Sequence, residues 1–307
     1  MGFFLGIDGG GTKTECMVGD ETKALGWAGA GSSKIARVGE EAANAALRDG
    51  IERACTAAGI TASQIRRTCV GVAGVSQSDS VAAIRRWLSG WVGGEVDVIA
   101  DSEIAHYAAF AGGAGIIVIA GTGSIAYGRN AQGEAARAGG LAPASGDPGS
   151  GEWIGRTAIN LALQANEYGQ NSTLLNAILK AWKLDHAQAL ARMASALPAP
   201  DFAALFPIIA VSSDALARRV LVRAARELSL LVADVVERLW PDAKPLDVAL
   251  YGGVLENSSE VRDAFTADLG ERHPQARVAA GKRRPAEGAL LMARNALVKS
   301  SAEAASH

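Results

Sequence analysis

Short apolar runs that end in glycine turns fill the first 30 residues, a pattern that predicts strands. A longer stretch then repeats alanine and other apolar residues at helical spacing and stops at Gly59, as helices commonly do. Beyond it, strand-like apolar runs alternate with helical ones. This order predicts a βββαβαβα unit of the ribonuclease-H-like kind. Its expected strands are 3–8, 14–18, 24–30, 68–73 and 96–100, and its expected helices are 38–58, 79–88 and 101–110.

The pattern starts again near residues 111–114 with a second group of three strands. A long helical stretch follows, and alternating strands and helices close the chain. We therefore expect an α/β protein with two ribonuclease-H-like domains. The first should span 1–112 together with the closing helix 287–299, and the second 113–286 with a helical insertion. The later strands are expected at 115–120, 124–129, 134–138, 246–251 and 276–280.

Composition narrows the class of protein. With 307 residues and 49% hydrophobic content the chain can bury a sizeable core, and its net charge of −2 gives no electrostatic reason to expect nucleic acid or an anionic membrane. No apolar run approaches the roughly 20 residues that span a bilayer, and no signal peptide is visible. Cys16, Cys55 and Cys69 form no CxxC pair, so we expect reduced core residues in a cytoplasmic protein.

The first glycine turn carries the strongest chemical signal. An apolar strand delivers Asp8 into three consecutive glycines. Because glycine has no Cβ, successive amide groups can point into one concavity that binds phosphate oxygens, and the adjacent carboxylate can hold Mg²⁺ through water. An ordinary glycine-rich turn is the alternative, and Lys13 could equally be a solvated strand residue. The residues expected at the nucleotide phosphates are Asp8, Gly9, Gly10, Gly11, Thr12 and Lys13, with Asp8 toward the metal.

Two further glycine turns follow apolar strands. One has the sequence Gly121-Thr122-Gly123-Ser124, and alone it would be an ordinary hairpin turn. It stands, however, at the place in the second domain that the first glycine turn occupies in the first. Two such loops facing one another across a cleft would clamp successive phosphates of a nucleotide. At the third turn, Gly252 and Gly253 would let the backbone approach an adenosine closely.

In this order and spacing the three turns resemble those of the actin, hexokinase and heat-shock ATPase superfamily. Within it, the chain is similar to the N-acetylglucosamine and glucosamine kinase family, which is grouped with the BadF/BadG-type activator ATPases. Segment 139–155 carries the resemblance best, because it matches that family's GG-x5-GD-x-GS pattern, and the likeness extends over 6–293. It implies two actin/hexokinase-type domains flanking a nucleotide and sugar cleft, with ATP and Mg²⁺ as cofactors.

The resemblance also implies roles for single residues. Asp101, which follows an apolar strand and opens a helix, would take the proton of the sugar hydroxyl, with an N-cap as the local alternative. Asp147 would accept hydrogen bonds from sugar hydroxyls, with capping of the next helix by Asp147 or Ser150 as the alternative. The remaining sugar-side positions would be Ser33, Lys34, Gly74, Gly139 and Gly140.

Three features depart from the pattern or lie outside it. Lys34 stands where N-acetylglucosamine kinases usually carry Asn, and Pro148 where they carry Glu or Gln. A solvated lysine is the plain explanation for Lys34, and a cation that receives an anionic sugar such as N-acetylmuramic acid is the alternative. The basic run 282–284 lies near a turn and predicts a solvated loop.

We therefore expect a kinase that uses ATP to phosphorylate the 6-hydroxyl of N-acetylglucosamine or glucosamine, with Asp101 as general base. One alternative is an N-acetylmuramic acid kinase, and another is an ATPase activator of a redox enzyme, which would need cysteines presented to an iron–sulfur cluster. A sugar sensor that lost catalysis is a third alternative, but only two residues precede the first expected strand, so we expect little room there for a DNA-binding motif. By resemblance the protein would bind ATP and an amino sugar, and would form a homodimer.

Overall fold

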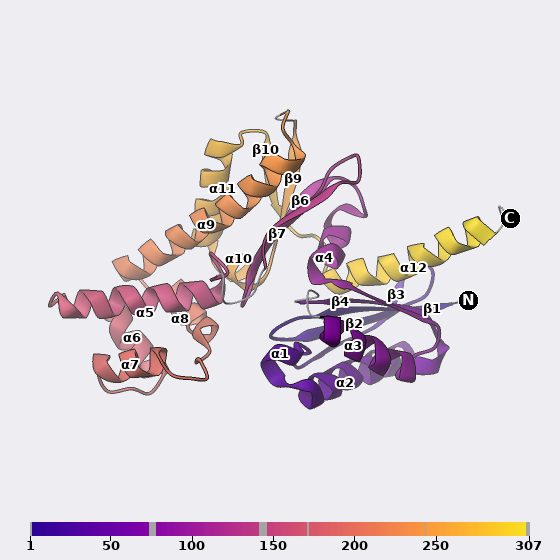
Figure 1. The fold of residues 1–307 in the computed structure, drawn as a ribbon, viewed down its shortest axis with the longest axis horizontal. Coiled ribbons are helices and arrows are strands. Elements are labelled where there is room, and N and C mark those ends of the chain that lie inside the picture. The colour runs from indigo at the N-terminus through magenta and orange to yellow at the C-terminus, as the bar shows by residue number, and fades with distance from the viewer. Residues whose placement is uncertain (1, 74–77, 141–145, 171, 243, 305–307) are drawn as a thin grey trace. The chain divides into compact units, whose positions relative to one another are not determined.

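The protein is described here by a computed structural model that covers all residues except 1, 74–77, 141–145, 171, 243 and 305–307. Its contacts divide the chain into two compact units (Figure 1). The first unit comprises Met1–Ile117 and Gly281–His307, and the second comprises Val118–Ala280. The chain therefore leaves the first unit once and returns to it near the C-terminus.

The first unit is built on a five-stranded sheet of order β3-β2-β1-β4-β5. The antiparallel part comes from the N-terminal meander, and β4 and β5 lie parallel to β1. Consequently β1, β4 and β5 all end at the same edge of the sheet, where polar residues that follow them can meet. The strands are β1 (Phe3–Gly9), β2 (Thr14–Gly19), β3 (Ala24–Ala30), β4 (Ile65–Val72) and β5 (Glu95–Ala100).

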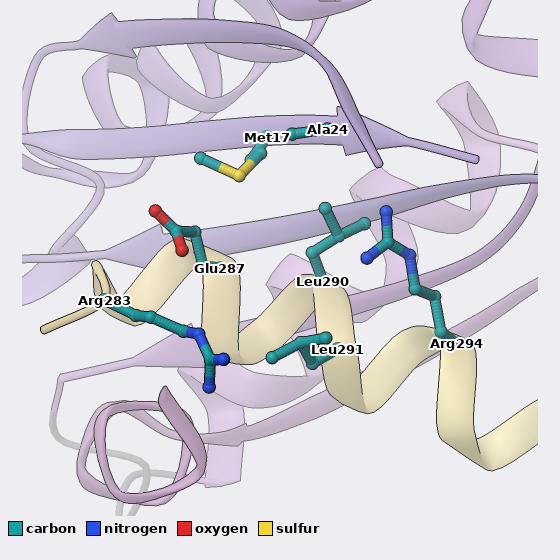
Figure 2. Close-up of a pocket in the computed structure, with 7 residues that line it drawn as sticks. All are labelled: Met17, Ala24, Arg283, Glu287, Leu290, Leu291 and Arg294. Carbon is teal, nitrogen blue, oxygen red and sulfur yellow. The ribbon is translucent and has the colours of Figure 1, made fainter. Parts of the chain in front are cut away.

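Helices cover both faces of this sheet. One apolar cluster joins strand residues to Leu47 and Leu88 of α2 and α3, and a second joins them to Ile104 and Leu290 of α4 and α12. Figure 2 shows Leu290 and Arg294 of α12 on the side of the sheet where Met17 projects. The expected helix 38–58 corresponds to α2 and starts two residues later, because Gly39, with a φ of 81°, separates it from the short helix α1, which was not expected. The helical elements are α1 (Ile35–Val38), α2 (Glu40–Ala58), η1 (Ala62–Gln64), α3 (Ser78–Trp91), α4 (Asp101–Phe110) and α12 (Pro285–Ala304).

The second unit repeats the same plan. Its sheet has the order β10-β9-β6-β7-β8. The first sheet, read in reverse, has the order β5-β4-β1-β2-β3, so β6, β7 and β8 take the places of β1, β2 and β3, and β9 and β10 those of β4 and β5. The strands are β6 (Gly115–Ala120), β7 (Ser124–Arg129), β8 (Ala135–Gly139), β9 (Leu246–Tyr251) and β10 (Ala276–Ala280). The helical elements are α5 (Gly151–Glu167), α6 (Thr173–Ala181), α7 (Ala187–Ala194), η3 (Phe202–Leu205), α8 (Phe206–Ala210), α9 (Ala215–Leu239), α10 (Gly253–Asn257) and α11 (Ser259–Arg272).

The Asp214 side chain accepts hydrogen bonds from the first turns of two helices in the second unit. Asp214 is the N-cap of α9 and accepts the Leu216 amide at 2.8 Å, while its other oxygen accepts the Leu174 amide in the first turn of α6 at 2.9 Å. The hydroxyls of Ser172 and Thr173 donate to that same oxygen. Burial by itself would raise the pKa of Asp214, but these hydrogen bonds outweigh it and bring the pKa to about 2.

The predicted fold class is confirmed, since each unit has the ribonuclease-H-like arrangement of a mixed five-stranded sheet with helices. Duplication of one strand order in two units also agrees with the repeated pattern in the sequence. Among the described helices, none is long and apolar enough to cross a membrane. Cys16, Cys55 and Cys69 are all buried with free thiols, as expected of core residues.

Candidate active site

Asp8 stands at the carboxyl end of β1, where the chain enters the first glycine turn. The Gly10 amide donates to the Lys13 carbonyl at 3.0 Å and so closes this turn between β1 and β2. Behind the turn, the Thr14 hydroxyl donates to Ser33 Oγ at 2.9 Å. Thr14 and Ser33 are both buried, so this bond fixes the turn against the segment that precedes α1.

Asp101 lies at the same edge of the sheet as Asp8. Strand β4 separates the two, with Gly71 paired to Asp8 on one side and Val72 paired to Ala100 on the other. Gly71 lets α4 pack closely on β4, because a β-carbon there would clash with Ile104 Cδ1 and lie 3.2 Å from the Asp101 Cα. The N-cap of α4 is Ala100 and not Asp101, which corrects the local alternative drawn from the sequence. Asp101 is instead the first residue of the helix, and its carboxylate accepts the Ser102 amide at 2.8 Å.

Burial raises the pKa values of both Asp8 and Asp101. Burial raises the pKa of Asp8 to about 7, the charges of Asp101 and Glu15 add to this, and Lys13 partly opposes it. Burial also raises the pKa of Asp101, while its hydrogen bond from Ser102 and the nearby Lys34 ammonium act in the opposite direction. Carboxyl groups with raised pKa values at one sheet edge are typical of sites that bind cations or transfer protons.

The surroundings of Asp8 fit a Mg²⁺ ion. The carboxylate is crowded by two others, so a cation beside it would relieve their repulsion. No group of three or more His, Cys, Asp or Glu side chains that could hold a metal occurs in the described part of the chain. Mg²⁺ bound to phosphates needs no such group, because it keeps several waters and takes only one or two protein carboxylates.

The structure reveals two residues that sequence reasoning missed at this edge. Glu15 of β2 lies directly opposite Asp8 in the strand register, and its Oε1 accepts the Lys13 ammonium at 2.7 Å. Arg284 Nη1 lies 3.9 Å from the other oxygen of Glu15, and its guanidinium stacks over Trp27 at 4.9 Å. Residues 282–284 form an exposed loop, as expected, and Arg284 in addition contacts Glu15 and Trp27. Strand alternation was the available signal for Glu15, since it places Lys13 and Glu15 on one face.

The expected sugar-side residues of the first unit lie beside the glycine turn. Ser33 is buried under it, and the Lys34 backbone amide donates to Ser32 Oγ at 3.2 Å. The Lys34 side chain is half-buried and passes Gly11, where a β-carbon would lie 3.6 Å from the Lys34 Cδ. Its ammonium is near enough to Asp101 to lower the pKa of that carboxyl. Gly74 lies outside the described residues.

In the second unit, the turn from Gly121 to Ser124 is tied to the start of α5. The Gly151 amide donates to the Gly121 carbonyl at 2.8 Å, and the Glu152 amide donates to the Thr122 carbonyl at 3.3 Å. Ser124 Oγ donates to the Pro148 carbonyl at 2.7 Å. The turn thus lies at the N-terminus of a 17-residue helix, where backbone amides favour anions.

The expected sugar-binding residues of this unit meet the same turn. The Gly140 amide donates to the Ser124 carbonyl at 2.9 Å, and Gly139 ends β8 beside it. Asp147 is buried and adopts a φ of 35°, which is uncommon for a residue with a side chain. A β-carbon on Gly123 would lie 2.8 Å from Asp147 Oδ2, so the carboxylate rests directly on the turn. Ser150 caps α5 by accepting the Trp153 amide, which leaves Asp147 without that role.

Gly252 stands where the third glycine turn was expected, directly after β9. It adopts a φ of 94°, and a β-carbon would lie 2.5 Å from the Ala120 carbonyl oxygen. Only glycine therefore fits between β9 and the end of β6. Gly253 begins α10, and its carbonyl accepts the Asn257 side-chain amide at 2.8 Å. The third turn thus lies beside the second one.

Nearly the whole chain matches one family. Residues 5–293 match the model of the BadF/BadG/BcrA/BcrD ATPase family. The chain belongs to this family. The predicted recognition is confirmed at this level, and the family name fits the glycine turns that lie at the sheet edges of both units.

The named relatives of this BadF/BadG/BcrA/BcrD ATPase are sugar kinases. The chain is 33% identical over 304 residues to an N-acetylmuramic acid/N-acetylglucosamine kinase of Clostridium acetobutylicum, covering 96% of this chain and 99% of the relative. It is 28% identical to an N-acetyl-D-glucosamine kinase of Dictyostelium discoideum, covering 95% and 98%. A crystal structure of a candidate N-acetylglucosamine kinase from Chromobacterium violaceum superposes with a TM-score of 0.79 at 28% identity, covering 95% of this chain and 99% of that one.

These similarities bear on the expected enzyme class. The family is one of ATPases, and the named relatives are sugar kinases, so the prediction of an enzyme of this type is confirmed. The roles of single residues, the hydroxyl that is phosphorylated and the sugar stay predictions. The structure nevertheless brings Asp8, Lys34 and Asp101 together in one unit, and the Gly121–Ser124 turn, Gly140 and Asp147 together in the other.

Proposed function

We propose that this protein transfers the terminal phosphoryl group of ATP to the 6-hydroxyl of N-acetylglucosamine or glucosamine. The observation that carries the proposal is the placement of Asp101 one strand away from Asp8, across Gly71. A proton acceptor and a phosphate-binding turn at one sheet edge are what a phosphoryl transfer to an alcohol needs. The named relatives support the sugar class.

In this proposal, Asp101 accepts the proton of the sugar hydroxyl as the oxygen attacks the phosphorus. The carboxylate is oriented by its bond from the Ser102 amide, so it need not be ordered when the substrate binds. The turn Gly9–Gly11 lies against one side of the phosphates, with the Gly10 amide closing the turn onto the Lys13 carbonyl, and Thr12 and Lys13 line the same turn. The second turn, from Gly121 to Ser124, contributes its own amides and hydroxyls.

Mg²⁺ would be held by Asp8 through water, and its contribution would be to neutralise charge on the phosphates. Gly252 and Gly253 would border the adenosine, because the close approach of β9 to β6 leaves a backbone surface there. Phosphoryl transfer has a loose transition state, so alignment and charge neutralisation are the main demands on the protein.

Asp147 would bind the sugar, with Gly139 and Gly140 supplying backbone groups, and Ser33, Lys34 and Gly74 stay the expected sugar-side residues of the first unit. Asp147 is buried and rests on Gly123, so its carboxylate is positioned beside a phosphate turn. Carboxylates suit vicinal hydroxyls, and a sugar that lacks one of them would leave a buried acceptor unmatched.

Lys34 favours N-acetylmuramic acid as a second candidate substrate. Its ammonium lies near Asp101, and no ion pair to a described residue fixes it. The lactyl carboxylate of N-acetylmuramic acid would meet this cation, and the Clostridium acetobutylicum relative is named for both sugars. Under this alternative, Lys34→Asn should raise the KM for N-acetylmuramic acid about tenfold, as for a lost charged contact, and leave that for N-acetylglucosamine unchanged.

An ATPase activator of a redox enzyme is less well supported. Such activators present cysteines to an iron–sulfur cluster. Here burial raises the pKa of Cys69 to about 12 and also raises the pKa values of Cys16 and Cys55. Protonated core thiols are poor cluster ligands. Iron and sulfide in an anaerobic preparation would reverse this judgement.

The decisive experiment is a coupled ADP-release assay with glucosamine, N-acetylglucosamine, N-acetylmuramic acid, N-acetylmannosamine and glucose, followed by NMR to locate the phosphate. Asp101→Asn should keep its affinity for Mg-ADP and lose at least about a hundredfold in kcat, since general-base catalysis contributes that much. Asp49→Asn, which alters an exposed pair with Arg53 on α2, is the matched control. Wild-type turnover in the Asp101 variant would refute the proposed base. The homodimer stays a prediction from the resemblance, and the cytoplasmic location stays a prediction from the composition of the chain.

A further inference from the structure

Glu15 and Asp8 place two carboxylates face to face across the β1–β2 hairpin. They are directly opposite in the register, so their side chains lie on one face of the sheet. Only 7% of Glu15 is exposed. Like charges at opposed positions destabilise an antiparallel pair, so the stability of the sheet gives no reason for a second acid here.

The contacts of Glu15 supply a different reason. One of its oxygens holds the Lys13 ammonium at 2.7 Å, and the other faces Arg284 at 3.9 Å. The Lys13 side chain is 70% exposed and belongs to the phosphate-binding turn. A lysine on such a turn has many accessible rotamers, and ordering it would reduce the affinity for any ligand it binds. Glu15 removes much of that freedom before a ligand arrives.

Arg284, from a distant part of the chain, also contacts the Glu15 carboxylate. It lies just after the chain returns to the first unit at Gly281 and directly before α12. Its guanidinium stacks on Trp27, whose strand neighbours that of Glu15. Glu15 is thereby approached from two sides, and its own rotamer is restricted by both cations and by the sheet.

We propose that Glu15 is a positioning residue for the nucleotide, acting through Lys13. It holds the Lys13 ammonium on the Asp8 face of the turn, so that the lysine meets the phosphates without first being ordered. This inference rests on the proposed function only in so far as the glycine turns bind a nucleotide. It requires no contact between Glu15 and the substrate.

A purely structural ion pair would behave differently. An ion pair between an exposed lysine and an acid contributes little to the free energy of unfolding. The repulsion between the Glu15 and Asp8 carboxylates reduces this contribution further. Removing Glu15 should therefore leave the melting temperature at or above that of the wild type while nucleotide affinity falls. A residue that only stabilises the hairpin would lower the melting temperature and leave the affinity unchanged.

The test is a double-mutant cycle with Glu15→Ala and Lys13→Ala. Isothermal titration with Mg-ADP gives the Kd, steady-state kinetics gives KM for ATP and for the sugar, and thermal unfolding gives stability. Each single variant should weaken Mg-ADP binding and raise KM for ATP about tenfold, the effect of one lost charged contact, with KM for the sugar unchanged. The double variant should bind no more weakly than Lys13→Ala alone, because Glu15 acts through that lysine.

Controls separate the possible failures. Glu95→Ala removes a strand glutamate paired with Arg67 elsewhere in the same sheet and should leave Mg-ADP affinity unchanged. Glu15→Gln keeps an acceptor for Lys13 and should restore part of the lost affinity. Additive losses in the double variant, or wild-type affinity in Glu15→Ala, would overturn the inference. A wild-type protein that binds no Mg-ADP would instead overturn the proposed function, and the inference with it.

Discussion

Ser124 Oγ donates a 2.7 Å hydrogen bond to the Pro148 carbonyl, and this bond joins the second glycine turn to the segment that carries Asp147. The two segments have separate proposed roles, one at the phosphates and one at the sugar. Their direct connection means that a change in one should be felt by the other. Gly123 strengthens the connection, because the Asp147 carboxylate rests on it.

Ser124→Ala should therefore impair binding of both substrates. Ser124 is buried, so losing its hydroxyl leaves the Pro148 carbonyl without this donor and should lower the free energy of unfolding by about 1–2 kcal/mol. We expect KM for ATP and KM for the sugar to rise together, each by about tenfold for one lost buried hydrogen bond. Ser172→Ala, which removes the cap of α6, should lower stability and leave both KM values unchanged. A rise in only one KM would show that the two segments act separately.

Binding of a Mg-nucleotide should strengthen as the pH rises. Burial raises the pKa of Asp8 to about 7, so at pH 6 this carboxyl is mostly protonated and must lose its proton before it can face Mg²⁺. Below the pKa, the Kd should fall by up to about tenfold for each unit of pH, and it should level off above pH 8. Titrations of Mg-ADP with the wild type and with Asp8→Asn check this, since the variant retains only the titration of the nucleotide itself. Parallel pH profiles in the two proteins would contradict it.

The acid limb of the activity profile should report Asp101. A general base must be ionised, so kcat/KM for the sugar should fall as the pH drops through the pKa of Asp101, which burial has raised. The nearby Lys34 lowers that pKa, and Lys34→Met should therefore move the acid limb to higher pH. Lys23→Met, which changes an exposed lysine in the β2–β3 turn, should leave the limb in place. A limb that moves to lower pH in Lys34→Met would refute the assignment.

Asp214 should make the second unit sensitive to acid. Its pKa is about 2 in the folded protein and about 3.9 in an unfolded chain, so its contribution to stability is complete above about pH 5 and is mostly lost by about pH 2. Because it begins two helices, Asp214→Ala should lower the free energy of unfolding by about 2 kcal/mol at pH 7, the upper end of the effect of one cap. Ser258→Ala removes the cap of α11 alone and is the comparison. The difference between Asp214→Ala and the wild type should vanish near pH 2, and a difference that persists there would count against this account.

Local patterns in the sequence were sufficient to predict the positions of several strands and of the glycine turns. Alternation and turn residues act over a few positions, so β1, β2, β6 and β7 lie where the apolar runs predicted them. Gly39 shows the limit of this reasoning. The predicted helix starts at residue 38, whereas α2 starts at Glu40, because Gly39 with its φ of 81° is the N-cap, and the short α1 before it was not predicted.

Contacts between distant segments were beyond sequence reasoning. Arg284 reaches Glu15 only because α12 packs against the first sheet, and nothing in the run 282–284 indicates that partner. Asp101 was placed correctly at the start of a helix, yet the cap fell one residue earlier. The charge of Asp101 helps to raise the pKa of Asp8, and the spacing of the two residues along the chain does not reveal that they lie close together.

The return of the chain to the first unit at Gly281 has a consequence for biosynthesis. Ala286, Ala289 and Leu290 complete the apolar cluster that also contains Phe4, Met17 and Cys69. While the ribosome is still making the second unit, that face of the first sheet is covered by α4 but not yet by α12, so the nascent chain must carry a partly open apolar surface through more than half of translation. Chaperone contacts with the emerging polypeptide are expected to concentrate on this face and to end once α12 docks.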